Sequence, residues 1–239
     1  MKILKDKAIV IRKRKFQDSH EIIIFFTRNN GKMSVMAKGL RKEKKPICFD
    51  GYMDVFSKMN IHTYHRNNGS LGNLIDCDLA DAYLGIRSEY SRLLVAWVII
   101  EVLEKGFPDG LESPEAFDMG VWALEAIDQG MTEHLLCRFL IKILELLGQG
   151  PKESDLLGGI SKPAEVRAFI RKLKTRVLEP GEDRHISFAD ATQLQDHLVL
   201  NFQSYINGVL RAYPVLRKNH ALGMSQAEPL SRSLLGYNR

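Results

Sequence analysis

The spacing of hydrophobic residues changes near residue 80. Before that point, apolar residues occur in short runs or alternate with polar ones, which is the period of two that is typical of β-strands. The predicted strands are Ala8–Ile11, Glu21–Thr27, residues 32–38, residues 55–61 and Leu71–Leu79. Asn-Asn-Gly sequences, which favour tight turns, precede residues 32 and 70. Five short strands in this length predict a small antiparallel barrel.

From about residue 85 onward, apolar residues recur every three to four positions, as in amphipathic helices. Helical spacing covers Leu93–Leu103, Phe117–Ile127, Leu135–Leu147, Val166–Val177 and Leu194–Leu210. Ser113 and Ser187 are expected to cap helices, and Pro163 is expected to open one. The Gly-rich stretch 148–162 is predicted to be a loop, and the polar tail from about residue 219 is expected to fray.

We therefore expect an α+β chain in two parts, with a barrel domain over residues 1–80 and an all-α helical domain over residues 81–239. Charge follows the same division, because the first part carries 16 basic and 8 acidic side chains and the second carries 18 and 21. The net charge of +5 thus comes from a basic barrel, which indicates a polyanionic partner. With 45% hydrophobic residues, the composition argues against a collagen-like or wholly disordered chain.

Three cysteines, Cys48, Cys77 and Cys137, lie far apart in the sequence. An odd and sparse set indicates a reducing compartment, and it lacks the closely spaced pairs of a cysteine zinc site. The N-terminal residues have no apolar core before charges return, and no apolar run approaches the roughly 18 residues of a membrane span. We therefore expect a cytosolic protein without a leader or a membrane span.

Two basic runs border the predicted strands. One is Arg12-Lys13-Arg14-Lys15 at the end of the first strand, and the other follows the third strand with Lys38, Arg41, Lys42, Lys44 and Lys45. Such runs neutralise phosphates and release counterions. Phe16 and Phe49 lie beside them, and small barrels bind single strands by combining a basic groove with aromatic stacking. The two runs together predict nucleic-acid binding, whereas either alone is also typical of a solvated loop.

Two groups of residues are reminiscent of metal ligands. His62 and His65 stand three apart in a predicted strand, so they point to opposite faces and are expected to be surface residues. Asp76, Asp78 and Asp81 lie at or beyond the end of the last predicted strand, where helix-capping and first-turn carboxylates are expected. No Ser, His and Asp spacing indicates a nucleophile. We therefore expect no metal, no cofactor and no catalytic residue.

A basic pair borders the most apolar predicted helix. Arg138 lies one residue before Phe139, and Lys142 lies one turn later. Such a pair beside an apolar face is able to bind a short acidic and hydrophobic peptide that ends in a carboxylate. The alternative, which the residues alone favour, is an ordinary helix edge whose charged ends reach solvent.

The order of these features resembles that of the bacterial RecO recombination mediators. The resemblance rests on Ala8-Ile9-Val10-Ile11, Asp18–Thr27, Asn30-Gly31-Lys32 and Ala37-Lys38-Gly39-Leu40-Arg41, and on the stretch from Leu135 through Arg138-Phe139 to Leu146-Leu147-Gly148 and Gly150-Pro151. It covers most of the chain. Its N-terminal motif is the more specific part, since the C-terminal half matches mainly in the order of helices.

The resemblance implies an OB-fold followed by a helical domain. It implies a non-enzymatic protein of the bacterial cytoplasm and nucleoid that binds single- and double-stranded DNA and anneals complementary strands. Its implied partners are RecR and the acidic C-terminal tail of single-stranded DNA-binding protein, with which it helps to load RecA. The implied DNA-backbone contacts are Lys32, Lys38, Arg41, Lys42, Lys44 and Lys45. The implied tail site consists of Arg138, Phe139 and Lys142.

Many members of that family carry a four-cysteine zinc loop after the central helix. Residues 149–162 of this chain contain no cysteine, so we expect no zinc loop here.

Three other functions stay open. An RNA-binding OB-fold protein would use the same physics, and a comparison of DNA with RNA separates it. A metal-dependent nuclease would use Asp76, Asp78 and Asp81, and labelled DNA with magnesium tests it. A scaffold whose basic loops only add solubility predicts no salt-sensitive retention of DNA.

Overall fold

The computed structural model describes residues 2–16, 20–38, 53–65, 71–131, 134–175 and 186–222. The chain divides into two compact units, Met1–Gly130 and Met131–Arg239. The described strands all belong to the first unit, together with the first two α-helices, and the second unit is helical. The change from strands to helices after residue 81 therefore falls inside the first unit. The division into domains at residue 80 stays a prediction.

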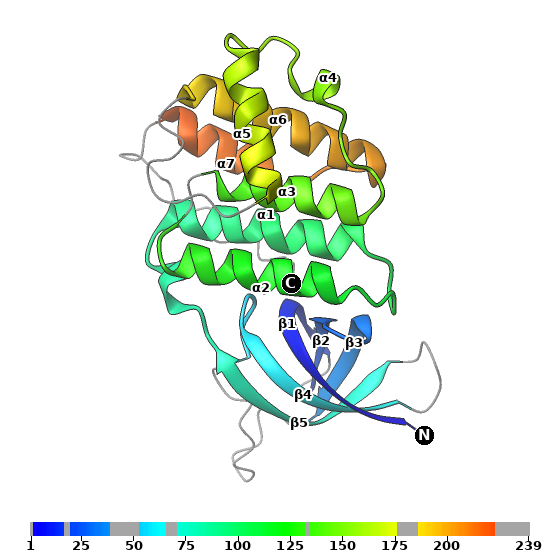
Figure 1. Ribbon diagram of the computed structural model, residues 1–239. Coiled ribbons are helices and arrows are strands. Elements are labelled where there is room, and N and C mark those ends of the chain that lie inside the picture. Colours follow the sequence, from blue (N-terminus) through cyan, green and yellow to red (C-terminus); the bar gives the residue numbers. More distant parts are fainter. Residues whose placement is uncertain are drawn as a thin grey trace. The chain divides into compact units, whose positions relative to one another are not determined.

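Five strands form a barrel in the first unit (Figure 1). They are β1 (Lys2–Phe16), β2 (His20–Thr27), β3 (Gly31–Lys38), β4 (Lys58–His65) and β5 (Gly72–Asp81). The order around the barrel is β1-β2-β3-β5-β4, and β4 closes it by pairing with β1. All pairings are antiparallel except that of β3 with β5. This topology is that of an OB-fold, so the expected OB-fold barrel followed by helices is confirmed.

The length of β1 explains how the barrel closes. Residues Lys2–Ile9 pair with β4, and residues Ala8–Phe16 pair with β2. The register shifts between Val10 and Arg12, which is a bulge of the kind that bends and twists a strand. One 15-residue strand therefore pairs with both of its neighbours, β2 and β4, in the barrel. The sequence pattern predicted only its central part, because charged residues flank that part on both sides.

Alternate residues of the strands fill the barrel. Ala8 and Val10 of β1 are fully buried together with Ile23 and Phe25 of β2 and Val35 of β3. Their spacing of two sends every second side chain into the interior. The sequence showed this alternation for β3, where Val35 and Ala37 were predicted to share a face and are both buried. In β1 and β2 the apolar runs were continuous, so the sequence did not distinguish their inward faces.

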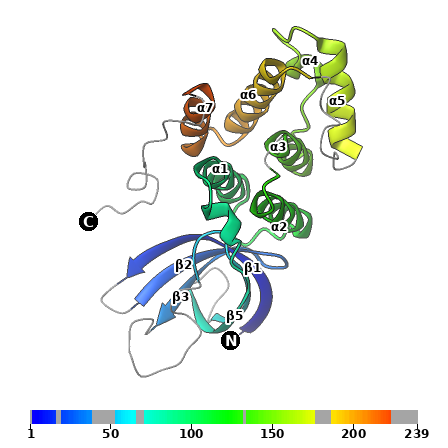
Figure 2. The same ribbon diagram turned by 90° about the vertical axis from the view of Figure 1, so that its left-hand side faces the viewer.

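Two helices, α1 (Tyr90–Gly106) and α2 (Pro114–Asp128), cover one end of the barrel (Figures 1 and 2). Ile9 lies on the outer side of β1 and is nevertheless fully buried. A Cβ atom added to Gly120 of α2 would lie 3.2 Å from the Ile9 side chain, so this glycine permits close packing of helix on strand. Ser113 precedes α2 as predicted, but its side chain makes no capping hydrogen bond.

The segment before β4 corrects one strand prediction. Alternation predicted a strand over residues 55–61, but β4 begins only at Lys58. Phe56 adopts a positive φ of 80°, and its ring packs edge-on against Trp97 of α1, with 5.1 Å between ring centroids. A residue in this conformation interrupts the extended backbone, so strand pairing starts after it.

The second unit contains five described helices. They are α3 (Leu135–Leu146), α4 (Glu153–Leu156), α5 (Pro163–Thr175), α6 (Phe188–Tyr205) and α7 (Ala212–Leu222). α3 packs against both α5 and α6, and Phe139, Phe169 and Phe202 are buried in this unit. The Ser187 hydroxyl accepts a hydrogen bond from the Asp190 backbone N–H (3.0 Å), so the predicted helix cap is confirmed.

The structure corrects three boundaries in this unit. The stretch 148–162, predicted as a loop, contains the short helix α4. The helical pattern through Leu210 is interrupted, because Asn207 has a φ of 46° between α6 and α7. Helix α7 continues to Leu222, past the point where the tail is expected to fray.

Candidate functional site

The basic run Arg12–Lys15 lies in the second half of β1, where the strand pairs with β2. Arg14 and Lys15 are exposed, whereas the Lys13 ammonium lies 3.6 Å from the Glu21 carboxylate of β2. Neighbouring residues of a strand point to opposite faces, so the run does not form one continuous surface. Its most exposed cations are those near the end of the strand.

Two cations of the predicted set meet the last turn of α1. Arg12 donates to the Glu104 carboxylate (Nη2 to Oε2, 2.7 Å), and Lys32 donates to the Glu104 carbonyl oxygen (Nζ to O, 2.6 Å). Lys32 also forms an ion pair with Asp109 at 3.1 Å, and only 16% of its side chain is exposed. Cations are favourable at the negative end of a helix dipole. Lys32 therefore ties β3 to α1, which does not fit the open phosphate contact that we expected.

The ends of the first three strands gather the exposed members of the set. Phe16 of β1 pairs with His20 of β2, and His20 pairs with Lys38 of β3. Arg14, Lys15 and Lys38, which we call the strand-end cluster, therefore lie at the same end of the barrel, and all three are exposed. The Phe16 side chain is 38% exposed beside them. The other residues of the second basic run and its neighbouring aromatic residue lie outside the described part of the chain: Arg41, Lys42, Lys44, Lys45 and Phe49.

Asp76, Asp78 and Asp81 belong to β5, so the expectation of helix-capping and first-turn carboxylates is wrong. The pairing of β5 with β4 extends to its last residue, which keeps these aspartates on extended backbone. Asp76 and Asp81 accept hydrogen bonds from the backbone N–H groups of Cys77 and Tyr83 (3.0 and 2.9 Å). In the part of the chain that the structure describes, no three His, Cys, Asp or Glu side chains are grouped to hold a metal ion.

The histidines of β4 and the cysteines contribute little reactive chemistry. His65 Nε2 lies 3.2 Å from the Thr63 hydroxyl, and His62 lines a cavity on the barrel surface. Cys77 and Cys137 are buried, and the third cysteine lies outside the described residues. Burial raises the pKa of the Cys137 thiol to about 12, so the thiol stays protonated at neutral pH.

The three predicted docking residues on α3 have different environments. Phe139 is fully buried, so its ring supports the helical core and does not line a surface as we expected. The Arg138 guanidinium donates to the Leu173 carbonyl oxygen near the end of α5 (Nη1 to O, 2.6 Å), and burial lowers its pKa. Lys142 forms an ion pair with Glu145 at 3.1 Å. Arg138 and Lys142 thus remain as the partly exposed members of the set.

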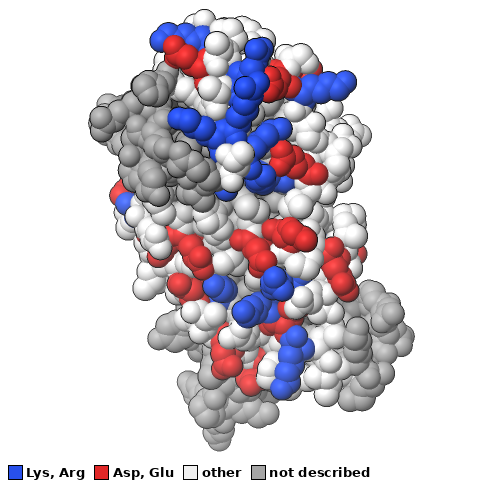
Figure 3. All heavy atoms as spheres, in the orientation of Figure 1, with Lys and Arg blue, Asp and Glu red and all other residues white. Residues whose placement is uncertain are grey.

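Helix α5 adds cations that are not among the predicted docking residues of α3. Its exposed or half-exposed positions carry Arg167, Arg171, Lys172 and Lys174. Figure 3 shows Lys and Arg side chains gathered over this helix. We call Lys142, Arg167, Arg171 and Lys174 the α3–α5 basic face. The helical period places these cations away from the buried residues Val166, Phe169, Ile170 and Leu173, and the packing of α5 on α3 brings them near Lys142.

In the described part of the second unit, two carboxylates form ion pairs with the four cations of the α3–α5 basic face. Glu145 lies between Lys142 and Lys174, at 3.1 and 3.2 Å. Glu153 of α4 faces the two arginines of α5, at 2.9 and 3.9 Å. Four cations share two anions, so the face keeps a positive balance that suits an acidic ligand.

These features define a class before any relative is considered. An OB-fold barrel with exposed cations and an aromatic ring at its strand ends, followed along the chain by a helical unit, is an OB-fold protein of the nucleic-acid-binding type. The family model described as "Recombination protein O N terminal" matches residues 1–83, and that described as "Recombination protein O C terminal" matches residues 87–186. The chain therefore belongs to the recombination protein O (RecO) family of DNA repair and recombination, and the resemblance stated above is confirmed.

Curated relatives carry the same family name. A "DNA repair protein RecO" from Exiguobacterium sibiricum is 29% identical over 148 residues, which cover 62% of this chain and 58% of the relative. The RecO protein of Rhodopirellula baltica is 31% identical over 145 residues, covering 60% and 53%. That of Syntrophus aciditrophicus is 28% identical over 148 residues, covering 62% and 56%. The matched part of the chain thus spans little more than half the length of each relative.

No helix among the described residues combines the length and apolar character that crossing a membrane requires.

Proposed function

We propose that this protein is a non-enzymatic recombination mediator. In this proposal it binds single- and double-stranded DNA, anneals complementary strands and acts at the nucleoid with RecR and single-stranded DNA-binding protein to load RecA. The observation that carries the proposal is the strand-end cluster of a RecO-family OB-fold, with Arg14, Lys15 and Lys38 beside the exposed ring of Phe16. Cations that follow the backbone and a ring on which bases stack are the means by which OB-folds hold a strand.

Annealing requires two polyanions to approach each other. Cations of the barrel lower their repulsion, because each neutralised phosphate releases its condensed counterions. Lys38 is followed along the chain by the basic residues Arg41, Lys42, Lys44 and Lys45, which extend the supply of positive charge from the same end of β3. The proposed mechanism therefore needs charge and stacking, and it needs no bond to be broken.

A second proposed contact is with the acidic tail of single-stranded DNA-binding protein. Arg138 and Lys142 are the proposed centre of this site, and the α3–α5 basic face supports them with two further arginines and Lys174. Carboxylates of the tail would compete with Glu145 for Lys142 and Lys174, each of which shares that single anion. Holding the tail raises the local concentration of the mediator at a coated strand without any new contact to DNA.

Strand annealing with fluorescently labelled complementary oligonucleotides tests the proposal. We expect annealing of naked DNA, continued annealing of DNA coated with full-length single-stranded DNA-binding protein, and little annealing when the coat lacks its acidic tail. RecA loading on coated DNA, measured as DNA-dependent ATP hydrolysis, is expected to need RecR as well. Preferential annealing of RNA would favour an RNA-binding protein instead, and cleavage of labelled DNA in magnesium would contradict a non-enzymatic mediator.

A further inference from the structure

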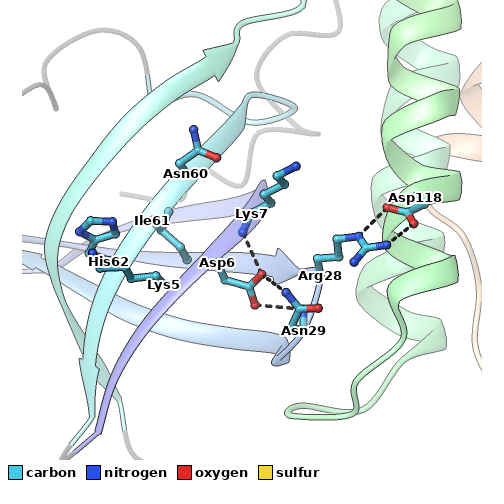
Figure 4. Close-up of a pocket in the computed structure, with 9 residues that line it drawn as sticks. All are labelled: Lys5, Asp6, Lys7, Arg28, Asn29, Asn60, Ile61, His62 and Asp118. Carbon is cyan, nitrogen blue, oxygen red and sulfur yellow. Dashed lines mark hydrogen bonds and ion pairs between the residues drawn. The ribbon is translucent and has the colours of Figure 1, made fainter.

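A cavity of about 550 Å³ opens on the barrel surface where β1 runs beside β4 (Figure 4). Lys5 and Lys7 of β1 line it, together with Asn60 and His62 of β4 and Arg28 from the connection between β2 and β3. Sequence reasoning missed this group, because Lys5 and Lys7 are separated from the long basic runs. All of these residues belong to the first unit.

The strand register brings the two lysines and the two polar residues to one face. Lys5 pairs with His62, and Lys7 pairs with Asn60. Residues directly opposite each other in neighbouring strands point to the same side of the sheet. Lys5, Lys7 and Asn60 are exposed and His62 is half-exposed, so this side faces solvent. The cavity is thus built on two adjacent strands and does not depend on a loop.

The Asp6 carboxylate at the edge of the cavity is already satisfied. It accepts hydrogen bonds from the backbone N–H groups of Lys7 and Asn29 (2.8 and 3.0 Å). The side-chain amides of Asn29 and Asn30 donate two more (3.0 and 2.7 Å). Asp6 is only 8% exposed. Its charge therefore holds the connection between β2 and β3 in place and is not available to pair with the lysines.

The second carboxylate of the cavity, Asp118 of α2, is neutralised by Arg28. The guanidinium donates two hydrogen bonds to it (Nε to Oδ1, 2.9 Å; Nη2 to Oδ2, 2.8 Å). These hydrogen bonds hold the pKa of the Asp118 carboxyl below its ordinary value. Figure 4 shows Arg28 turned toward α2. Because Arg28 neutralises Asp118, the remaining charges of the cavity are those of Lys5, Lys7 and the hydrogen-bonded Asp6, with a balance of one positive charge.

Neither lysine has an ion-pair partner among the residues that the structure describes. Alternate residues of a strand stand about 7 Å apart, so the two ammonium groups share one small surface. Like charges at such a distance repel, and an anion placed between them would relieve that repulsion. The charge of the cavity therefore suits an anionic ligand.

We propose that this cavity binds a backbone phosphate of a DNA strand, with Lys5 and Lys7 as the charged contacts and Asn60 and His62 as further hydrogen-bond donors. Lysines accompanied by amide side chains are typical phosphate contacts in DNA complexes. The strand that carries Lys5 and Lys7 also carries Arg14 and Lys15 of the strand-end cluster, so one strand of the barrel supplies both contacts. The proposal rests on the proposed function, and it adds a second DNA contact on the β1–β4 side.

Fluorescence anisotropy with a labelled 20-nucleotide single strand tests the site on the full chain. The variant Lys5→Gln/Lys7→Gln removes two charges, and Lys152→Gln/Lys218→Gln removes two exposed charges elsewhere as the matched control. We expect the cavity variant to bind about tenfold more weakly at 0.1 M salt, and the salt slope of log affinity to shrink by about 0.7, since one single-strand phosphate contact contributes about 0.7. The control is expected to stay within about twofold of the unchanged protein.

A second variant, Asn60→Asp, keeps the lysines and places a carboxylate in the cavity. We expect it to weaken DNA binding as well, while circular dichroism shows an unchanged fold. If the unchanged protein binds DNA but neither cavity variant alters affinity or slope, or if the control loses as much, the site is wrong and the proposed function stands. If the unchanged protein shows no salt-sensitive binding at all, the proposed function itself is wrong.

Discussion

The two units neutralise their cations in different ways. In the first unit, cations of the strands pair with carboxylates of the covering helices, as Arg12 does with Glu104 (2.7 Å) and Lys58 with Glu125 (3.0 Å). These pairs join helix to barrel. In the second unit, four cations of the α3–α5 basic face share two glutamates, so positive charge remains at the surface. A count of basic residues therefore does not say which of them face a ligand.

The basic run Arg12–Lys15 therefore does not contain all of the cations that are available to a ligand. Part of that run is used within the protein, whereas the isolated Lys5 and Lys7 have no ion-pair partner in the described structure. The four predictions below test this difference between the units.

The largest effect is expected where the barrel meets the connection between α1 and α2. Gly31 has a φ of 66°, and a Cβ atom there would lie 2.3 Å from the Leu111 carbonyl oxygen. We expect Gly31→Ala to lower the free energy of unfolding by about 3 kcal/mol, through backbone strain and a clash with main-chain atoms. Gly110→Ala is the matched control, because Gly110 also has a positive φ, of 72°, but open space around it.

Urea denaturation followed by circular dichroism measures both glycine variants. For Gly110→Ala we expect a loss of about 1 kcal/mol, from strain alone. Equal losses in the two variants would mean that the barrel turn does not depend on close contact with the helices of its own unit.

The next largest effect is expected on DNA affinity, when the strand-end cluster and the cations of α5 are changed in separate variants. One variant carries Arg14→Gln, Lys15→Gln and Lys38→Gln, and the other carries Arg167→Gln, Arg171→Gln and Lys174→Gln. We expect the first to weaken binding of single-stranded DNA by about 30- to 100-fold at 0.1 M salt and to reduce the salt slope by about 2, since three phosphate contacts are lost. The second is expected to change DNA affinity less than about threefold, because its charges belong to the proposed tail site. Anisotropy titrations over salt compare them.

We also expect Lys42→Glu, Lys44→Glu and Lys45→Glu in the basic loop to weaken DNA binding and to reduce the salt slope. These residues lie outside the described part of the chain. An unchanged salt slope in either barrel variant would remove those residues from the DNA site. Equal losses in the barrel and α5 variants would mean that only the total charge matters.

A smaller effect is expected at Arg138. Arg138→Ala removes a guanidinium and should weaken binding of a labelled acidic tail peptide about tenfold, the range of one charge-assisted contact. Annealing of naked DNA should stay unchanged. Arg138→Lys keeps the charge without the planar donor group, so an intermediate affinity is expected. Loss of peptide binding and annealing together would contradict two separate surfaces.

The smallest effect concerns pH and the helical unit. The Ser161 backbone N–H and then the Ser161 hydroxyl hold the pKa of the Asp190 carboxyl below its ordinary value of 3.8. Its anion therefore stabilises the fold above that value, and the contribution disappears as pH falls through the lower folded pKa. Asp190→Asn should lower the urea midpoint at pH 7, and the difference from the unchanged protein should shrink as pH falls below 3.8. A constant difference at all pH values would contradict this assignment.

Much of the fold could be predicted from local patterns. Alternation placed Val35 and Ala37 on one face of β3, and both are buried in the barrel, while the Ser187–Asp190 spacing identified the start of α6. Strand ends were less predictable. The predicted strand Leu71–Leu79 stops before β5 does at Asp81, because the exposed end of a strand shows no hydrophobic alternation.

The site was less predictable than the fold. The sequence indicated that Arg14, Lys15 and Lys38 are basic and lie near strand ends. It indicated the same for Lys32 of β3, whose ammonium group donates to the Glu104 carbonyl oxygen of α1. Phe139 has the spacing of a docking residue and is buried in the core. Exposure of a side chain depends on what packs over it, and no local pattern contains that information.

The sequence by itself determined the change from strands to helices, the turn before Gly31 and the excess of positive charge near the N-terminus, because each depends on neighbouring residues. Only the tertiary structure decided which cations remain available. The parallel pairing of β3 with β5 completes the barrel. The helices α1 and α2 bring carboxylates to Arg12 and Lys58. The register of β1 with β4 places Lys5 and Lys7 beside His62 and Asn60. These are contacts between residues up to 92 positions apart, and Coulomb interactions depend on distance in space, not on distance along the chain.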